Sequence, residues 1–151
     1  MRVNRLDKFA SDLYLSLGVT KIEDLSIENL SCKFGVKIYY YDLESFLYKS
    51  ANGDCIVIDS RRNNMQQRSD FFHELAHYLL EHYSSSNKLI TNYFEGKADT
   101  LMGYLAIPLH LIETSEVDFD DPNYIQKMSA EFGMEFDLTF QRLNKLRNLG
   151  S

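Results

Sequence analysis

The sequence predicts an α+β fold, because helical and strand patterns occupy different stretches of the 151-residue chain. Apolar residues recur at helical spacing before residue 35 and after residue 64, whereas residues 36–60 carry strand-like runs and a tight-turn signal. Hydrophobic residues make up 44% of the chain, which excludes a disordered regulator and is enough to bury a core. We therefore expect a small three-stranded antiparallel sheet packed with several helices.

Two helices are predicted in the first 35 residues. Residues 4–17 place apolar side chains at helical spacing and end at Gly18, and residues 26–34 begin at the capping residue Ser26 and stop at Gly35. Patterns of this kind are more typical of scaffold than of a functional site.

Three strands are predicted at residues 36–41, 45–50 and 54–59. The pair Asn52-Gly53 favours a tight hairpin between the last two strands, so an antiparallel sheet is the simplest arrangement. An edge strand of such a sheet could bind an extended peptide by strand addition. The aromatic side chains of these strands are more typical of core and cross-strand pairs than of substrate contacts; they are Tyr39, Tyr41, Phe46 and Tyr48.

The remainder of the chain is predicted to be mostly helical. Helices are expected over residues 64–82, 91–106, 108–112, 123–132 and 137–148, and Pro108 marks the boundary between the second and third of these. No repeat or linker divides the chain, so we expect one domain over residues 1–151. Its parts would be N-terminal helices at 1–35, the sheet at 36–60, further helices at 61–112 and C-terminal helices at 121–149.

The stretch His73-Glu74-Leu75-Ala76-His77 lies within the predicted helix at 64–82. Residues four apart share one face of a helix, so both imidazoles can reach a single metal ion. A glutamate directly after the first histidine is placed to act on a water bound to that metal. The motif therefore predicts a zincin-like metal-binding helix in which His73 and His77 bind Zn²⁺ and Glu74 is the general base.

A third zinc ligand is predicted downstream, because catalytic zinc sites have three protein ligands and leave the fourth position to water. Glu95 and Asp99 share one face of the helix expected at 91–106. Glu95 would bind the metal, and Asp99 would accept the free ring N–H of a ligating histidine, His73 in our interpretation. A solvated acidic helix face is the alternative interpretation of this pair.

Charge and hydropathy restrict the partners of the chain. The net charge of -6 provides no positive field for nucleic acid, so direct DNA binding is disfavoured. No apolar run is long enough to span a membrane and the N-terminal residues show no signal-peptide pattern, so we expect a cytoplasmic protein. The two cysteines, Cys32 and Cys55, lack metal-type spacing and are expected to be free thiols.

The motif and its downstream context resemble the ImmA/IrrE family of metallo-endopeptidases over roughly residues 36–146. The resemblance rests on three segments that stand in the order of that family. They are His73-Glu74-Leu75-Ala76-His77-Tyr78-Leu79-Leu80, the run Glu95-Gly96-Lys97-Ala98-Asp99 with its continuation to Ile107-Pro108, and Phe132-Gly133-Met134 followed by Gln141-Arg142-Leu143. It implies a single metallopeptidase domain that cleaves a helix-turn-helix repressor in a phage or mobile element, with the DNA-binding partner a separate protein.

Two other functions remain open at this point. A non-catalytic metal-containing protein could sequester a repressor without cutting it, but such a module has no use for the base Glu74. A purely structural zinc site is also possible, although such sites usually fill all four positions with Cys or His. The group that stabilises the oxyanion stays unassigned, and spacing does not choose among its four candidates. These candidates are His82, Tyr93, Tyr104 and His110.

Overall fold

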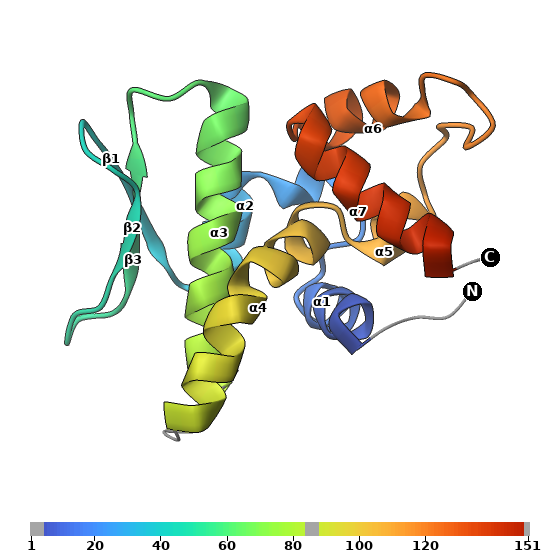
Figure 1. Ribbon diagram of the computed structural model, residues 1–151. Helices are drawn as coiled ribbons and strands as arrows, with labels where there is room; N and C mark the ends of the chain where they lie inside the picture. The colour runs from blue at the N-terminus through green and yellow to red at the C-terminus, as the bar shows by residue number, and fades with distance from the viewer. Residues whose placement is uncertain (1–4, 84–87, 150–151) are drawn as a thin grey trace. The chain divides into compact units, whose positions relative to one another are not determined.

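The computed structural model describes the chain over residues 5–83 and 88–149, with side chains given for 5–81 and 97–146 (Figure 1). The chain forms two compact units. Unit 1 contains residues 1–25 and 103–151, and unit 2 contains residues 26–102. The expectation of one domain over the whole chain stays a prediction.

Unit 2 contains a three-stranded sheet of β1 (Lys37–Tyr41), β2 (Phe46–Tyr48) and β3 (Cys55–Asp59), in the order β1-β3-β2. Strand β2 pairs antiparallel with β3, whereas β1 pairs parallel with β3, so that Lys37 lies opposite Cys55. The α+β class is confirmed. The prediction of a wholly antiparallel sheet is wrong, because the sheet is mixed.

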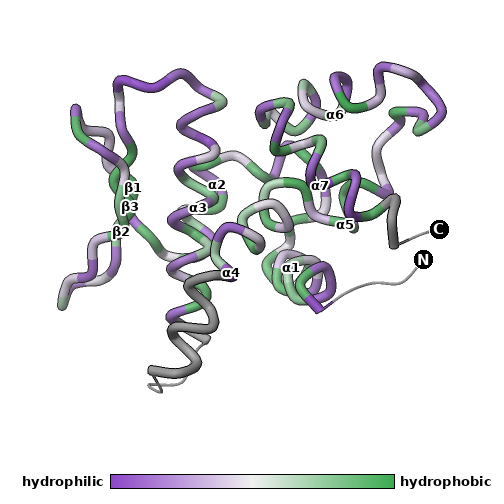
Figure 2. Tube along the Cα trace, in the orientation of Figure 1, coloured by the Kyte–Doolittle hydropathy of each residue, from purple (hydrophilic) through white to green (hydrophobic). Residues whose placement is uncertain are grey.

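The central position of β3 explains the mixed sheet. Its residues Ile56, Val57 and Ile58 are at most 4% exposed, whereas β1 and β2 carry half-exposed tyrosines such as Tyr41 and Tyr48. The most apolar strand thus occupies the position where both edges are covered, and the more polar strands form the edges. The connection over residues 42–45 then leaves β1 and β3 running in the same direction. Figure 2 shows the apolar residues of β3 and the hydrophilic loop that leads from it to α3.

The helices of unit 2 begin and end at residues with clear capping roles. Helix α2 (Ile27–Phe34) begins at Ser26, whose Oγ accepts the Asn29 N–H at 3.1 Å, and ends at Gly35, whose φ is 69°. Helix α3 (Asn64–Tyr83) follows a reciprocal pair: Asn63 Oδ1 accepts the Gln66 N–H and Gln66 Oε1 accepts the Asn63 N–H. Both starts agree with the sequence prediction.

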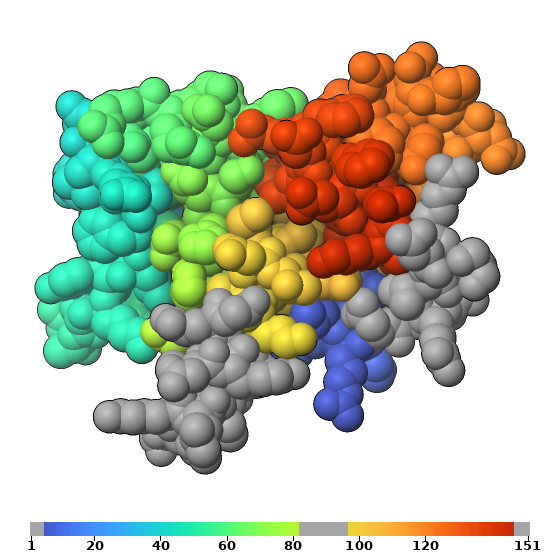
Figure 3. Space-filling view, viewed as in Figure 1, coloured from blue at the N-terminus to red at the C-terminus, as the bar shows by residue number. Residues whose placement is uncertain are grey.

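Helix α3 packs against the strands β2 and β3, and α2 contacts β1. Figure 3 shows the surface of α3 directly beside that of the sheet. Among the described side chains of α3, the buried ones are all apolar; they are Phe71, Phe72, Leu75, Ala76 and Leu79, each at most 1% exposed. Helix α4 (Lys88–Ala106) belongs to unit 2 as far as residue 102. The apolar face of α3 fixes the rotation of the helix about its axis, and therefore fixes where its polar residues point.

Unit 1 contains the end of α4 and the elements α1 (Arg5–Ser16), η1 (Ile22–Leu25), α5 (Leu109–Ile112), α6 (Tyr124–Phe132) and α7 (Phe136–Leu149). Helix α1 packs against α5 and α6 packs against α7. The fully buried Tyr14 donates its hydroxyl to Leu105 O at 2.8 Å. The 3-10 helix η1 was not anticipated from the sequence. Within the described ranges no helix is both long and apolar enough to cross a membrane.

A buried ion pair joins the ends of the sequence within unit 1. The Arg142 guanidinium on α7 binds Asp7 on α1, and their side chains are 2% and 0% exposed. Arg142 Nε also donates to Ile107 O at 2.9 Å, and its guanidinium carbon lies 4.3 Å from the centre of the Tyr104 ring. Burial lowers the pKa of Arg142, and the negative charge of Asp7 opposes that shift. The charged groups are therefore held inside the core by several partners at once.

Candidate functional site

The two histidines of the motif converge at one point on helix α3. His73 and His77 are both partly buried, on the flank of the apolar face formed by Phe72 and Ala76. Their Nε2 atoms lie 3.2 Å apart, and the rings meet edge to face with centroids 4.7 Å apart. The i, i+4 spacing thus brings two nitrogen donors to the same place.

Asp99 contacts the other nitrogen of the first histidine. Its Oδ1 lies 3.1 Å from His73 Nδ1, with 83% of the Asp99 side chain and 37% of the His73 side chain exposed. A carboxylate in this position orients the ring, and it selects the tautomer that leaves Nε2 without a proton and able to act as a ligand. Unit 2 therefore places Asp99 where it can fix the orientation of His73.

Glu95, the predicted third ligand, lies in α4 one helical turn before Asp99, and its side chain is outside the described residues. Among the described side chains, no three His, Cys, Asp or Glu residues gather as a complete metal site. The two histidines nevertheless fit zinc. Two nitrogens bound about 2.0–2.1 Å from one tetrahedral ion stand about 3.3 Å apart, close to the observed 3.2 Å.

Glu74 is a partly buried carboxylate with an altered proton affinity. Burial raises its pKa above the ordinary value, His73 lowers it, and the negative charge of Asp70, one turn earlier, raises it. The backbone N–H of Leu47 in strand β2 faces the Glu74 carboxylate and acts in the opposite direction, lowering its pKa. A carboxylate with a raised pKa is better suited to receive a proton near neutral pH than an ordinary glutamate.

A polar cavity of about 270 Å³ lies beside Glu74. One wall is held by Asp70, whose Oδ2 accepts the Ser45 hydroxyl at 2.7 Å and lies 3.0 Å from Arg62 Nε. The Arg61 guanidinium, bound to both carboxylate oxygens of Asp59, lowers the pKa of that group to about 2. The cavity is lined by Glu44, Ser45, Asp59, Arg62, Asp70, His73 and Glu74.

No motif in the sequence indicated Ser45, Asp70 or Arg62 as residues of this site. The one signal in the sequence that could have indicated Asp70 is its position one helical turn before Glu74. Ser45 belongs to a short loop whose position depends on how the strands pair, and the sheet was wrongly predicted to be wholly antiparallel.

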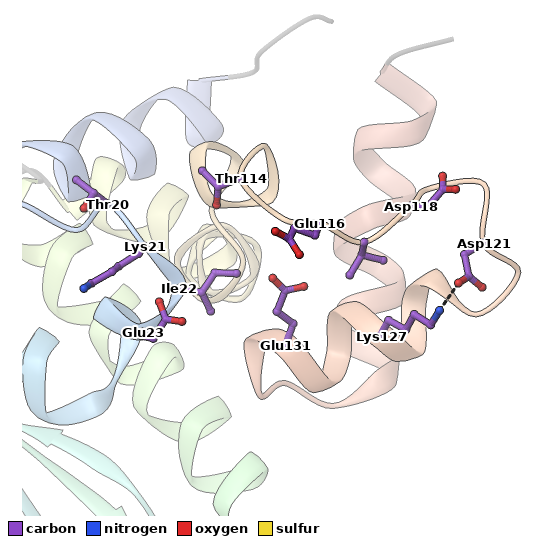
Figure 4. Close-up of a pocket in the computed structure, with 11 residues that line it drawn as sticks. Thr20, Lys21, Ile22, Glu23, Thr114, Glu116, Asp118, Asp121, Lys127 and Glu131 are labelled. Atoms are coloured by element: carbon purple, nitrogen blue, oxygen red, sulfur yellow. Dashed lines mark hydrogen bonds and ion pairs between the residues drawn. The ribbon is translucent and has the colours of Figure 1, made fainter.

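A second cavity, of about 660 Å³, lies within unit 1 and contains none of the candidate site residues (Figure 4). Helix η1, helix α6 and the loop between α5 and α6 form its walls. Figure 4 shows the carboxylates of Glu116 and Glu131 facing each other beside Ile22, and Lys127 paired with Asp121. The lining carries five acidic side chains and two lysines, so it would attract cations rather than anions.

Two of the four oxyanion candidates belong to the packing of unit 1. Tyr104 is 4% exposed and lies under the Arg142 guanidinium. The His110 ring bridges Ser11 Oγ at 3.1 Å and Val19 O at 2.9 Å through its two nitrogens. The side chains of the other two candidates, His82 and Tyr93, lie outside the described residues. The oxyanion role therefore stays unassigned.

A helix bearing His-Glu-x-x-His beside a small sheet, with paired imidazoles and a partly buried glutamate, is typical of a metallopeptidase-like domain. The chain belongs to the Peptidase_M78 family, described as the IrrE N-terminal-like domain, whose model matches residues 23–144. This confirms the resemblance to the ImmA/IrrE family. The family suggests a peptidase.

Two relatives from Bacillus subtilis (strain 168) match nearly the whole chain. The phage-like element PBSX protein XkdA is 22% identical over 144 residues, which are 94% of this chain and 73% of the relative. The uncharacterized protein YqaB is 19% identical over 144 residues, which are 93% of this chain and 83% of the relative. The first name links one relative to a phage-like element.

Proposed function

We propose that the protein is a zinc-dependent endopeptidase that cleaves a helix-turn-helix repressor and so relieves repression in a phage or mobile genetic element. The observation that carries the catalytic part is the approach of His73 Nε2 and His77 Nε2 to 3.2 Å, with Glu74 between them in the sequence. Membership of the Peptidase_M78 family supports the same reaction class.

In this proposal His73, His77 and Glu95 hold Zn²⁺. When bound, zinc supplies Lewis acidity, which acidifies a water molecule and polarises the scissile carbonyl. Asp99 holds the His73 ring through Nδ1, which favours the tautomer that carries its proton on Nδ1. The unprotonated Nε2 then points toward His77. The four side chains thus divide into three ligands and one orienting group.

Glu74 is the proposed proton carrier of the reaction. Its carboxylate takes a proton from the attacking water and later delivers it to the leaving amine. Burial and the nearby charge of Asp70 favour the protonated form between these two transfers, because both raise the pKa of Glu74. The Leu47 N–H faces the carboxylate and favours its charged form, so it opposes this rise in pKa.

A repressor protein rather than DNA is the proposed partner. The net charge of -6 gives the chain no general attraction to phosphate groups, so contact with an operator would come through the repressor. The relative named for a phage-like element supports a role within mobile elements. Sequestration of the repressor without cleavage is the alternative function. It is disfavoured because a binding module has no use for a base at the position of Glu74.

The test is incubation of the zinc-loaded protein with the purified helix-turn-helix protein encoded beside it, followed by electrophoresis and mass spectrometry of the fragments. We expect cleavage at one or a few peptide bonds. A chelator should stop cleavage, and added zinc should restore it. An intact partner that nevertheless forms a stable complex with the protein would support sequestration and overturn the peptidase proposal.

Replacing Asp99 with alanine is expected to weaken zinc binding by about 10–100-fold, because the His73 ring loses the acceptor at its Nδ1. Competition with a chromophoric chelator measures this affinity directly. The matched control is Asp12→Ala, which removes an exposed carboxylate paired with Lys8 on α1. Equal zinc affinity in the two variants would contradict the orienting role of Asp99.

A further inference from the structure

Strand β2 and its flanking residues are tied to helix α3 at three points. Alternate residues of the strand segment contact acidic residues spaced along one side of the helix. Ser45 donates its hydroxyl to Asp70, the backbone N–H of Leu47 faces the Glu74 carboxylate, and Lys49 forms an ion pair with Glu81. We call these three contacts the β2–α3 ladder. Its middle contact involves the proposed general base.

The spacing of the ladder matches the geometry of its two elements. Two residues advance about 6.6 Å along a strand, and four residues advance about 6 Å along a helix. The distance along the strand from Ser45 to Leu47 is therefore nearly the same as the distance along the helix from Asp70 to Glu74. The last step on the helix is longer, and the flexible side chain of Lys49 spans the difference to Glu81. Strand and helix thus stay in register next to Glu74.

Ser45 makes the best-defined contact of the ladder. Its hydroxyl donates to Asp70 Oδ2 at 2.7 Å, and its Oγ accepts the Asp59 backbone N–H from the end of β3 at 2.8 Å. The Asp70 side chain is 20% exposed and is also held by Arg62. In contrast, the side chains of Lys49 and Glu81 are 58% and 41% exposed, so that ion pair adds little. Ser45 therefore joins β2, β3 and α3 at one atom.

We propose that Ser45 is a positioning residue for the peptidase reaction: by binding Asp70 and β3 it fixes the start of strand β2 against α3, in the wall of the cavity that Glu74 also lines, and so keeps the Glu74 carboxylate in its working orientation. The proposal rests on the proposed function, because Glu74 is assigned as the base there. Ser45 acts through Leu47 and Glu74 and touches neither substrate nor metal. Its loss would free the start of β2 and widen the range of Glu74 orientations.

The Ser45→Ala variant tests this role against Ser50→Ala. Ser50 lies in the same hairpin and also donates its hydroxyl, to Gly53 O at 2.7 Å, but it has no contact with α3 among the described residues. We expect kcat for cleavage of the helix-turn-helix partner to fall about 10-fold in Ser45→Ala, with KM and zinc affinity within about two-fold of wild type. The Ser50→Ala variant should match wild type in all three quantities.

Rescue and a structural measurement complete the test. Ser45→Thr keeps the hydroxyl and should restore most of kcat, whereas Asp70→Asn keeps the shape and weakens the hydrogen bond, so it should lower kcat even if Ser45→Ala folds poorly. Amide hydrogen exchange at Leu47 should be about 10-fold faster in Ser45→Ala than in Ser50→Ala. This exchange measurement needs no substrate, so it tests the ladder even if the wild type cleaves nothing and the proposed function fails. Equal exchange at Leu47, or a kcat unchanged in both Ser45→Ala and Asp70→Asn, would overturn the positioning role.

Discussion

Replacing Glu74 with glutamine is expected to abolish cleavage while the fold and the metal affinity are retained. Glutamine has nearly the shape of glutamate and its amide oxygen can still face the Leu47 N–H, so the packing of strand β2 against α3 is retained. It has no carboxylate to take up a proton, and loss of a general base lowers kcat by about 100–10,000-fold. The rate of loss of the intact helix-turn-helix partner measures the effect.

The matched control for Glu74→Gln is Glu81→Gln, which makes the same change two turns later on the same helix. Glu81 pairs with Lys49 at the surface and has no proposed role in proton transfer. We expect this variant to cleave at the wild-type rate. If Glu74→Gln instead clears the partner as fully as wild type does, cleavage does not use the proposed base. If it relieves repression as fully while the partner stays intact, the sequestration model is favoured.

Replacing Arg142 with methionine is expected to lower the free energy of unfolding by about 3–5 kcal/mol. Methionine fills much of the same volume but leaves the Asp7 carboxylate in the core with its main cationic partner removed. It also removes the donor to Ile107 O, which costs a further buried hydrogen bond. Urea unfolding followed by circular dichroism measures the change.

Two further variants separate burial of charge from loss of packing. Lys8→Met breaks the exposed pair with Asp12 on α1 and should cost less than about 1 kcal/mol. The double variant of Asp7→Leu with Arg142→Met removes both charges and should recover much of the stability lost in the single variant. A single variant as stable as Lys8→Met would show that the ion pair contributes nothing to unit 1.

Local signals explain why many of the element boundaries were predicted well from the sequence. Ser26 and Gly35 define α2 because each cap acts within about one turn of its own end: the Ser26 hydroxyl accepts the Asn29 N–H, and Gly35, which has a positive φ, donates its N–H to Cys32 O and Ser31 O. The predicted helix at 64–82 agrees with α3 for the same reason, since Asn63 and Gln66 cap it locally. The hairpin between β2 and β3 likewise follows from Asn52-Gly53.

Features that depend on contacts between distant residues were not predictable in this way. The parallel pairing of β1 with β3 is set by which strand gains most from the centre of the sheet, and no single turn encodes that choice. The Asp7–Arg142 pair links residues near opposite ends of the chain. At the site, the spacing of His73 and His77 was informative, whereas the contact of Ser45 with Asp70 required the strand order to be known.

The order β1-β3-β2 also sets an order of events in folding. The β2–β3 hairpin closes through the short connection at residues 49–54, so it forms from local contacts. Within the described part of the chain, strand β1 pairs only with β3. Because β1 lies further away along the chain, we expect it to add to a hairpin that already exists. Before that step, the backbone N–H and C=O groups along one edge of the apolar β3 are unpaired and can bind any other extended chain. The interval between hairpin formation and the docking of β1 is therefore the stage at which a newly made chain is most exposed to aggregation.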